Sequence, residues 1–343
     1  MNFSSDNAYG ACPEILEAIV RSAEGSQPSY GEDDFSKRLR ARLSEIFERQ
    51  VHAFPVITGT AANSLALATL CPPHGAIFCH EEAHIATDEC AAPEFFTHGA
   101  KVVGIAGEGA KITSDAIAAT LPNFSRGVHS PRPSVVSITQ LSELGTAYSG
   151  QEIARMGEFC RSRDLYLHMD GARFANALVG LRASPAALTW QAGVDVLSFG
   201  ATKNGALGAE CVIFFDAEKA ADFEYRRKKS GHLLSKMRFV SAQLEAYLTD
   251  DLWLRTAARA NSLAGDLARA LERVPGAKLA YPVQGNQVFV HLPDATIARL
   301  RAAGAKFYDW QTSHDGRTLI RLVTSFATPQ SAVQQFIELA GRA

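Results

Sequence analysis

The sequence predicts an α/β protein with a mostly parallel sheet, followed by a smaller α+β unit. Short apolar segments alternate with helical segments from about residue 54 to residue 215, which is the pattern of a parallel sheet covered on both faces. After about residue 245 the pattern changes to a long helix and then mixed strands and helices. The length of 343 residues suits two domains, and 47% hydrophobic with 20% charged residues is an ordinary globular composition.

The first fifty residues are expected to form an extended arm and two helices. Residues 1–12 look extended, and Pro13 suits the first turn of a helix that runs to about Glu24. The turn-rich loop GSQPSYGEDD follows. From Asp34 to Gln50 apolar residues recur at helical spacing, which predicts a second helix.

Strands and helices then alternate, as a parallel sheet requires. The expected strands are FPVIT, GAIFCH, KVVGIA, PSVVSIT, LYLHM, VDVLSFG and ECVIFF. The expected helices lie at about 61–70, 86–96, 113–121, 150–163 and 174–181.

A domain boundary is expected near residue 248. It divides a large domain, 1–247 with the N-terminal arm, from a small C-terminal domain, 248–343. The small domain opens with the helix DDLWLRTAARANSLAGDLARALERV, capped by Asp250 or Asp251. QVFVHL, KFYDW and TLIRLVTSF are expected as strands, ATIARLRAAG as a helix, and Thr328–Pro329 as the start of a last helix.

Charge and cysteine content exclude several classes of partner. The net charge of −2 gives no electrostatic basis for binding nucleic acid or an anionic membrane. The six cysteines are scattered without a CxxC motif, which fits reduced thiols in a cytoplasmic protein. MNFSSDNAYG does not resemble a signal peptide, and the uncharged span Gln50 to Cys79 contains turn residues that argue against a membrane helix.

Two predicted strands end in a polar group that suits cofactor chemistry. LYLHMDGAR places Asp170 after one strand, and VDVLSFGATKNGA places Lys203 after another. Carboxyl ends of parallel strands meet at the edge where α/β sheets bind ligands. A lone Asp there is most often a helix cap, and most lysines are solvated. Together, however, they suit pyridoxal 5'-phosphate (PLP), with the lysine as Schiff base and the carboxylate on the pyridinium nitrogen.

TGTAANSLALATL, from Thr58 to Leu70, is a candidate phosphate site. A strand ends before Gly59, and a helix begins near Thr60, so free backbone N–H groups and the helix dipole favour one phosphate. The alternative is a plain Gly-Thr cap. No GxxxxGK[ST] or GxGxxG motif supports a nucleotide site.

Histidines and one arginine complete the candidates. His80 to His84 matches HExxH, but this zinc pattern needs a helix, and here it follows a strand, so no metal site is predicted. His129, in GVHSPRPS before a strand, is expected to reach the same sheet edge. Arg321 offers bidentate geometry for a substrate carboxylate.

These motifs, in this order, resemble a known family. SSDNAYG, SYGEDDF, TGTAANSLALATL, AHIATDEC, LHMDGARFANA, SFGATKNGA and IRLVTSF are similar to segments of low-specificity L-threonine aldolases, over nearly the whole chain. These are PLP enzymes of the aspartate-aminotransferase fold class, so the resemblance implies a PLP-dependent transferase-like large domain. HMDGAR and the lysine motif are specific together.

The resemblance also implies roles around the cofactor. Lys203 looks like the Schiff-base lysine, Asp170 like the partner of the pyridine nitrogen, and Arg173 like the contact to the ring hydroxyl and the substrate carboxylate. His84 looks like the histidine stacked on the ring. The residues that match the phosphate-binding groups are Gly59, Thr60, Ala61 and Thr202.

Substrate and subunit contacts follow from the same resemblance. Ser5 and Arg321 look like carboxylate binders, and His129 matches the family's second active-site histidine. Tyr30 and Arg238 are similar to residues that reach a neighbouring subunit's site, with the cofactor or the substrate. The family is usually a homotetramer of paired dimers.

The expected reaction is PLP-dependent cleavage of L-threonine, L-allo-threonine or a related β-hydroxy-α-amino acid to glycine and an aldehyde. The general base is His84, His129 or a water held by both. The strand ending VVSIT continues QLSELG where many relatives carry Glu-Asn-Thr-His, which indicates a distinct subgroup. Alternatives are another PLP lyase or racemase of this fold, an HExxH zinc hydrolase, and a non-catalytic relative.

Overall fold

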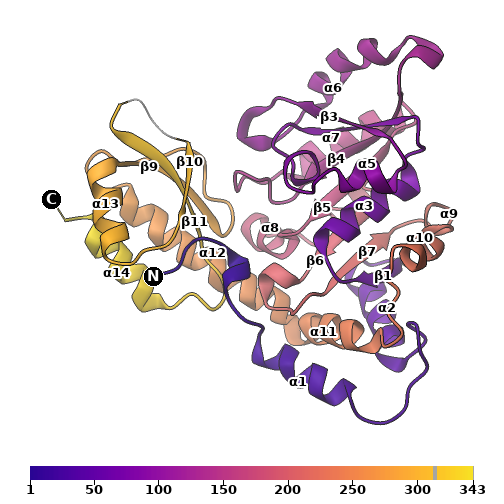
Figure 1. The fold of residues 1–343 in the computed structure, drawn as a ribbon, viewed down its shortest axis with the longest axis horizontal. Helices are drawn as coiled ribbons and strands as arrows, with labels where there is room; N and C mark the ends of the chain where they lie inside the picture. The colour runs from indigo at the N-terminus through magenta and orange to yellow at the C-terminus, as the bar shows by residue number, and fades with distance from the viewer. Residues whose placement is uncertain (312–314, 343) are drawn as a thin grey trace.

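The computed structural model describes residues 1–311 and 315–342, which form two sheets with helices around them (Figure 1). The larger sheet has seven strands and the smaller has four. All seven strands expected before residue 216 are present, so the α/β class is confirmed.

The large sheet has the order β1-β7-β6-β5-β4-β2-β3. Its strands are β1 His52–Val56, β2 Gly75–His80, β3 Lys101–Ile105, β4 Arg132–Thr139, β5 Tyr166–Gly171, β6 Val196–Gly200 and β7 Glu210–Phe214. Strands β3, β2, β4, β5 and β6 are parallel, whereas β7 is antiparallel to both β6 and β1. Asp170 pairs in register with Thr139 on β4 and with Ser198 on β6, so the ends of these strands share one edge.

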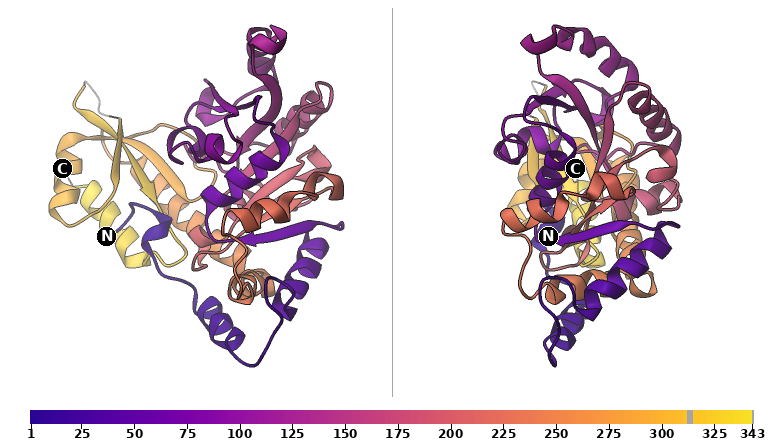
Figure 2. Two further views of the ribbon diagram at one scale, coloured as in Figure 1. Left: turned by 45° about the vertical axis from the view of Figure 1, so that its right-hand side comes forward. Right: turned by 90° about the vertical axis from the view of Figure 1, so that its right-hand side faces the viewer.

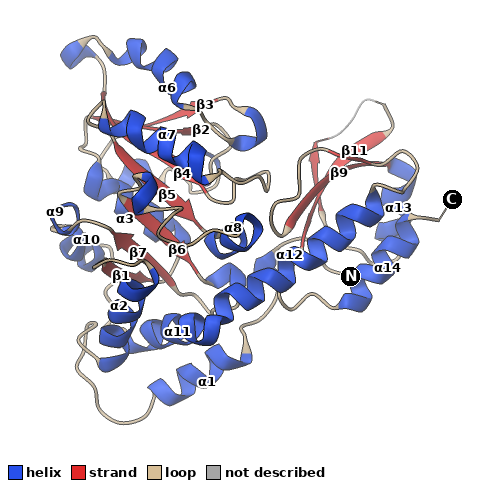
Figure 3. Ribbon diagram, turned by 180° about the vertical axis from the view of Figure 1, so that it is seen from behind, coloured by secondary structure: helices blue, strands red, loops and turns tan. Residues whose placement is uncertain are grey.

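Both faces of this sheet are buried, which explains its apolar strands. Ile77 and Phe78 are successive residues of β2 and lie in different hydrophobic cores. One face packs on α3 (Gly59–Leu70), whose residues are buried on nearly every side. The other is covered by α7 (Gly150–Arg161) and α8 (Phe174–Leu181), which lie in front of the strands in Figure 3.

The helices before and between the strands follow the expected pattern with one interruption, and three helices that were not expected follow β7. The other helices of this part are α1 Pro13–Ser22, α2 Asp34–Ile46, α6 Ser114–Thr120, α9 Ala217–Ala220, α10 Phe223–Lys229 and α11 Arg238–Leu248. The helix expected at 86–96 is instead two short helices, α4 His84–Thr87 and α5 Ala92–Phe96. Cys90 and Ala91 lie between them at φ 51° and 59°, a left-handed conformation that no α-helix can include.

The small sheet has the antiparallel order β10-β11-β9-β8. Its strands are β8 Lys278–Leu279, β9 Gln287–Pro293, β10 Tyr308–Gln311 and β11 Arg317–Val323, and it packs with α12 Leu252–Leu271, α13 Asp294–Ala302 and α14 Gln330–Ala340. None of the described helices combines the length and hydrophobicity that a bilayer crossing needs.

The two cores share α12 and the N-terminal arm. Trp253, near the start of α12, lies in the core of the large sheet, whereas Leu263 and Leu267 lie in the core of the small sheet. Phe3 is fully buried in the latter core, and Asn2 bridges to Lys306, so the arm lies against the small unit (Figure 2). The domain division at 247/248 stays a prediction.

Candidate active site

Lys203 lies in a turn that only small residues permit. Strand β6 ends at Gly200, where a Cβ would lie 2.7 Å from the Cα of Ala172 on the neighbouring strand's turn. After Lys203, Gly205 adopts φ +115°, which L side chains rarely adopt, and returns the chain toward Cys12. The Lys203 amine makes no hydrogen bond or ion pair with the described residues. Burial and the nearby Arg173 charge lower the pKa of Lys203.

Asp170 is held rigidly at the end of β5. It is 4% exposed, and its Oδ2 accepts a hydrogen bond of 2.8 Å from Asn63 Nδ2 on α3. Its Oδ1 accepts a bond of 2.9 Å from the Ala172 N–H. The carboxylate is therefore oriented by a helix that lies across the sheet and by its own turn.

Asn63 links Asp170 to His84 through a second carboxylate. The same Asn63 Nδ2 donates to Glu89 Oε1 at 2.9 Å, and Glu89 Oε1 lies 2.7 Å from His84 Nδ1. The hydrogen bond that His84 Nδ1 donates to the Glu89 carboxylate raises the pKa of His84, although burial acts against the charged ring. His84 is thus favoured as a cation with a fixed ring orientation.

Arg173 is paired with a residue of the N-terminal arm. Its Nε and one terminal nitrogen donate to the two oxygens of Asp6 at 2.8 and 3.1 Å. Burial alone raises the pKa of Asp6, but the charges of Arg173 and Lys203 and the hydrogen bonds from Arg173 and Asn286 outweigh burial and lower it. Arg173 is therefore a neutralised, bidentate partner and not a free cation.

Arg321 is the second arginine near this pair. It extends from β11, with its guanidinium 5.1 Å from the centre of the Trp310 ring and 5.3 Å from that of Tyr308. Its Nε is buried and has no hydrogen-bond partner among the described residues. Burial and the charge of Arg173 lower its pKa. An anionic ligand would give the buried Nε a hydrogen-bond partner, and its charge would offset the repulsion between the two arginines.

Apart from Asp6 and Arg321, which do not line it, these side chains converge on one small cavity. Its volume is about 60 Å³. Its lining residues are Gly59, Asn63, His84, Glu89, Thr139, Leu141, Glu143, Asp170, Ala172, Arg173 and Lys203. The structure therefore brings Lys203, Asp170, Arg173, His84 and Gly59 together, as the sequence predicted.

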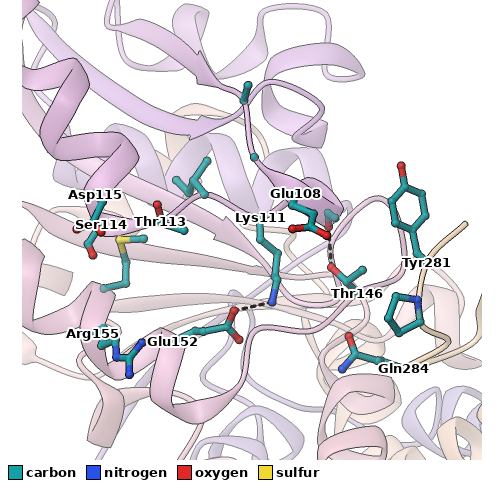
Figure 4. Close-up of a pocket in the computed structure, with 16 residues that line it drawn as sticks. Glu108, Lys111, Thr113, Ser114, Asp115, Thr146, Glu152, Arg155, Tyr281 and Gln284 are labelled. Carbon is teal, nitrogen blue, oxygen red and sulfur yellow. Dashed lines mark hydrogen bonds and ion pairs between the residues drawn. The ribbon is translucent and has the colours of Figure 1, made fainter.

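A larger cavity, of about 710 Å³, lies elsewhere and lacks this chemistry (Figure 4). In it Lys111 points to Glu152 and forms an ion pair of 2.6 Å, and the same amine bonds to the Ala147 carbonyl. Its lysine is therefore already neutralised. The smaller cavity is the better candidate because its charged groups include an unpaired amine.

The expected phosphate end lies at the start of α3. The Thr58 hydroxyl caps this helix by accepting a hydrogen bond of 3.1 Å from the Ala61 N–H, so this N–H already has a partner within the protein. Gly59 and Thr60 occupy the first turn, where N–H groups have no helical acceptor. On the facing turn, the Thr202 hydroxyl bonds to Ala209.

Several expected site residues do not line the cavity. His129 is exposed and lies three residues before Arg132, the first residue of β4. A loop that precedes a parallel strand lies at the amino edge, so the expectation that it reaches Asp170's edge is wrong for this chain. Ser5 caps the short helix at Asp6 by accepting from the Asn7 N–H.

Tyr30 and Arg238 lie in a different region. Tyr30 is 47% exposed at φ 61° and its N–H donates to the Ser235 carbonyl. Arg238 begins α11 and reaches the Gly25 carbonyl at 3.5 Å. Both belong to a surface formed by the 25–31 loop and the start of α11, so a role in a neighbour's site stays a prediction.

The zinc alternative lacks its structural requirement. His80 is the last residue of β2, and His84 opens α4 after a turn, so the two do not share a helical face. Both nitrogens of His80 bond to backbone, at Gly107 and Glu82. Among residues 1–311 and 315–342 no cluster of metal-ligating side chains occurs.

Five residues in or beside this site were not singled out from the sequence. They are Asp6, Asn63, Glu89, Glu143 and Glu210. Glu210 accepts from the N–H groups of Ala201 and Thr202 beside the lysine, and burial raises its pKa to about 7. Asp6, Asn63 and Glu89 lie inside the motifs SSDNAYG, TGTAANSLALATL and AHIATDEC, and this position in the motifs is the only sequence signal that pointed to them. Glu143 lies inside the segment QLSELG that departs from many relatives.

The cavity fits the functional groups of PLP. Asn63 Oδ1, Glu89 Oε2 and Glu143 Oε2 are buried atoms without hydrogen-bond partners in the described structure. A polar ligand would supply partners for such atoms. This cofactor requires an amine for the Schiff base, a carboxylate for the pyridinium nitrogen and a helix N-terminus for the phosphate, and the site contains all three.

Comparisons with known proteins agree with this geometry. Residues 2–295 match the model of the beta-eliminating lyase family. The chain is 44% identical to a low-specificity L-threonine aldolase of Pseudomonas aeruginosa, covering 89% of this chain and 88% of the relative. It is 41% identical to one from another Pseudomonas strain, covering 97% and 95%. The structure of Leishmania major threonine aldolase superimposes with a TM-score of 0.93 at 28% identity, covering 99% and 98%. The chain therefore belongs to the beta-eliminating lyase family and, within it, to the low-specificity L-threonine aldolases.

Proposed function

We propose that the chain binds PLP at Lys203 and cleaves L-threonine, L-allo-threonine and related β-hydroxy-α-amino acids to glycine and an aldehyde. The observation that carries this proposal is the unpaired Lys203 amine, which lines the same cavity as Asp170 and His84. The names of the relatives supply the reaction.

PLP, when bound, supplies an electron sink for the pair released from the broken bond. Lys203 would hold the cofactor covalently, and its lowered pKa favours the neutral amine that this needs. Asp170, fixed by Asn63, holds a proton on the ring nitrogen by charge. Gly59, Thr60 and Thr202 are the proposed phosphate contacts.

Arg321 is the proposed anchor of the substrate carboxylate. Its unpartnered Nε and its nearness to Arg173 both favour an incoming anion. The further carboxylate contacts that we propose are Ser5 and the terminal nitrogen of Arg173 that does not bond to Asp6. Holding the carboxylate fixes rotation about the Cα–N bond, and this orients the Cα–Cβ bond for cleavage.

His84 is the proposed residue over the cofactor ring and beside the β-oxygen. Its Nδ1 bond to Glu89 leaves Nε2, which lies 3.6 Å from the exposed Asp88 carboxylate, as the nitrogen that can face a ligand. The raised pKa favours the protonated ring, in which this nitrogen carries a proton that it can donate. His84 can therefore stabilise the negative charge that develops on the substrate β-oxygen as its proton is removed.

We also propose a cytoplasmic homotetramer in which Tyr30 and Arg238 reach a neighbouring subunit's site. Support comes from large apolar side chains that are exposed in the single chain. Phe95 is 73% exposed and Tyr225 is 79% exposed, which is typical of surfaces that bury against another subunit. Sedimentation of the cofactor-loaded protein tests this proposal.

Product analysis of the purified protein tests the function. L-threonine and L-allo-threonine should each release glycine and acetaldehyde from a protein that absorbs in the visible range. Lys203→Ala should lose that absorbance and essentially all turnover; wild-type turnover in this variant would refute the scheme. β-Elimination is the second candidate because of the family's description, and it would release ammonia and a keto acid instead.

A further inference from the structure

Glu143 projects from the segment that follows β4 into the cavity around Lys203. It lines this cavity with Thr139 and Leu141. Its Oε1 is fixed by two donors: the backbone N–H of His84 at 3.0 Å and the Thr139 hydroxyl at 2.9 Å. A carboxyl group held by one oxygen has little freedom to turn away from the site.

The second oxygen of Glu143 is left without a partner. Oε2 is buried and makes no hydrogen bond with the described residues. Leaving a buried acceptor unpaired is costly, so the site is built for a donor that arrives with a ligand. A β-hydroxy-α-amino acid brings such a donor in its hydroxyl group.

We propose that Glu143 is a catalytic residue, the general base that removes the β-hydroxyl proton of the substrate. This inference rests on the proposed function. The substrate O–H bond breaks and its proton passes to Glu143 Oε2. The oxygen's electron pair forms the C=O bond of the aldehyde while the Cα–Cβ pair moves to Cα, and one proton then returns to Cα to give glycine.

The charged groups around Glu143 separate its role from that of His84. The titratable residues facing the same cavity are His84, Glu89, Asp170, Arg173 and Lys203. Burial raises the pKa of Glu143 to about 7, with the Asp170 charge in the same direction and the bonds from His84 and Thr139 opposing it. A general base is most effective when its pKa lies near the working pH, which favours Glu143. His84 is less suited to accept a proton because its raised pKa favours the cation.

Glu143→Gln is the first test because an amide has the same shape but cannot take up a proton. The variant should lower kcat for L-threonine cleavage by ~10²–10⁴. It should keep the visible absorbance of bound PLP. It should also keep the exchange of the glycine Cα proton with deuterated solvent, followed by NMR, since glycine has no β-hydroxyl. Glu108→Gln, an exposed glutamate that does not line the cavity around Lys203, is the matched control.

Thr139→Val is the second test and uses the pH profile. The wild-type rate should fall below about pH 7 as Glu143 becomes protonated, and this limb should be absent in the residual rate of Glu143→Gln. Thr139→Val removes a hydrogen bond that lowers the pKa of Glu143, so its limb should move to higher pH.

The outcomes separate this inference from the proposed function. Wild-type cleavage by Glu143→Gln, or parallel loss of cleavage and glycine exchange, would overturn the role of Glu143 and leave the function intact. An acid limb of the pH–rate profile that stays at the wild-type pH in Thr139→Val would also overturn the role of Glu143 and leave the function intact. A wild-type protein that binds no PLP and exchanges no glycine proton would overturn both.

Discussion

Asp6→Asn is expected to destabilise the protein strongly because it removes the charge that neutralises Arg173. The Asp6 side chain is 1% exposed and that of Arg173 is 13% exposed, so water cannot replace the lost partner. Breaking a buried ion pair from one side costs about 3–5 kcal/mol. Asparagine keeps one acceptor oxygen, so we expect the lower end, about 3 kcal/mol.

The assay is urea unfolding, followed by the fluorescence of the three tryptophans, together with thermal melting. At roughly 2.1 cal/mol/K per residue over 343 residues, about 3 kcal/mol lowers Tm by about 4 °C. The control is Asp266→Asn, which breaks an Asp–Arg pair whose side chains are 36% and 67% exposed. That variant should change stability by less than about 1 kcal/mol.

A double variant tests the cause of the loss. Adding Arg173→Gln removes the unpaired charge, so Asp6→Asn with Arg173→Gln should be less destabilised than the two single changes combined. The pKa of Asp6 is lower in the folded state than its value near 3.8 in the unfolded state. The contribution of Asp6 to the free energy of unfolding is therefore complete above the unfolded pKa and is lost as the pH falls through the folded pKa. The gap between variant and wild type should therefore shrink in acid. Equal stability of Asp6→Asn and the control at pH 7, or additive effects in the double variant, would refute the argument.

Other predictions concern the histidines and the lysine turn. His84→Asn should lower kcat by ~10²–10⁴ with PLP absorbance kept, whereas the exposed His129→Asn should retain wild-type kcat in the same steady-state assay. Glu89→Gln should lower the pKa of His84 in an NMR titration, because it removes the bond that raises that pKa; an unchanged value would contradict this. Gly205→Ala should lower Tm, since a Cβ would lie 2.3 Å from Cys12 Sγ at a φ that alanine avoids, and Cys12→Ala should restore only part of the loss.

The sheet was predictable because burial on both faces leaves a simple trace in the sequence. Strands such as β2 and β6 are continuous apolar segments bounded by turn residues, and all seven were recognised. Their order and the reversal of β7 depend on pairing between distant segments. No periodicity within a strand reports such pairing. The position of Phe3 in the core of the small sheet could not be predicted for the same reason, since only tertiary contacts bring it there.

The site was predictable where its residues follow strands. Asp170 and Lys203 were found because they follow strands at the carboxyl edge of a parallel sheet. Asn63 and Glu89 were missed as participants because their bonds join residues 26 and 107 positions apart. Glu143 was passed over because its segment departs from the pattern of many relatives, although that departure is where the structure places a buried carboxyl group.

Helix α12 has a consequence for dissecting the protein into fragments. A cut at residue 248 would leave Leu252 and Trp253 on the C-terminal fragment, where they would face water instead of the core of the large sheet. The same fragment would lack Phe3, so the core of the small sheet would contain a hole the size of a phenyl ring. Each piece would then expose adhesive apolar surface, and co-expression of the two halves should recover soluble material that neither gives alone.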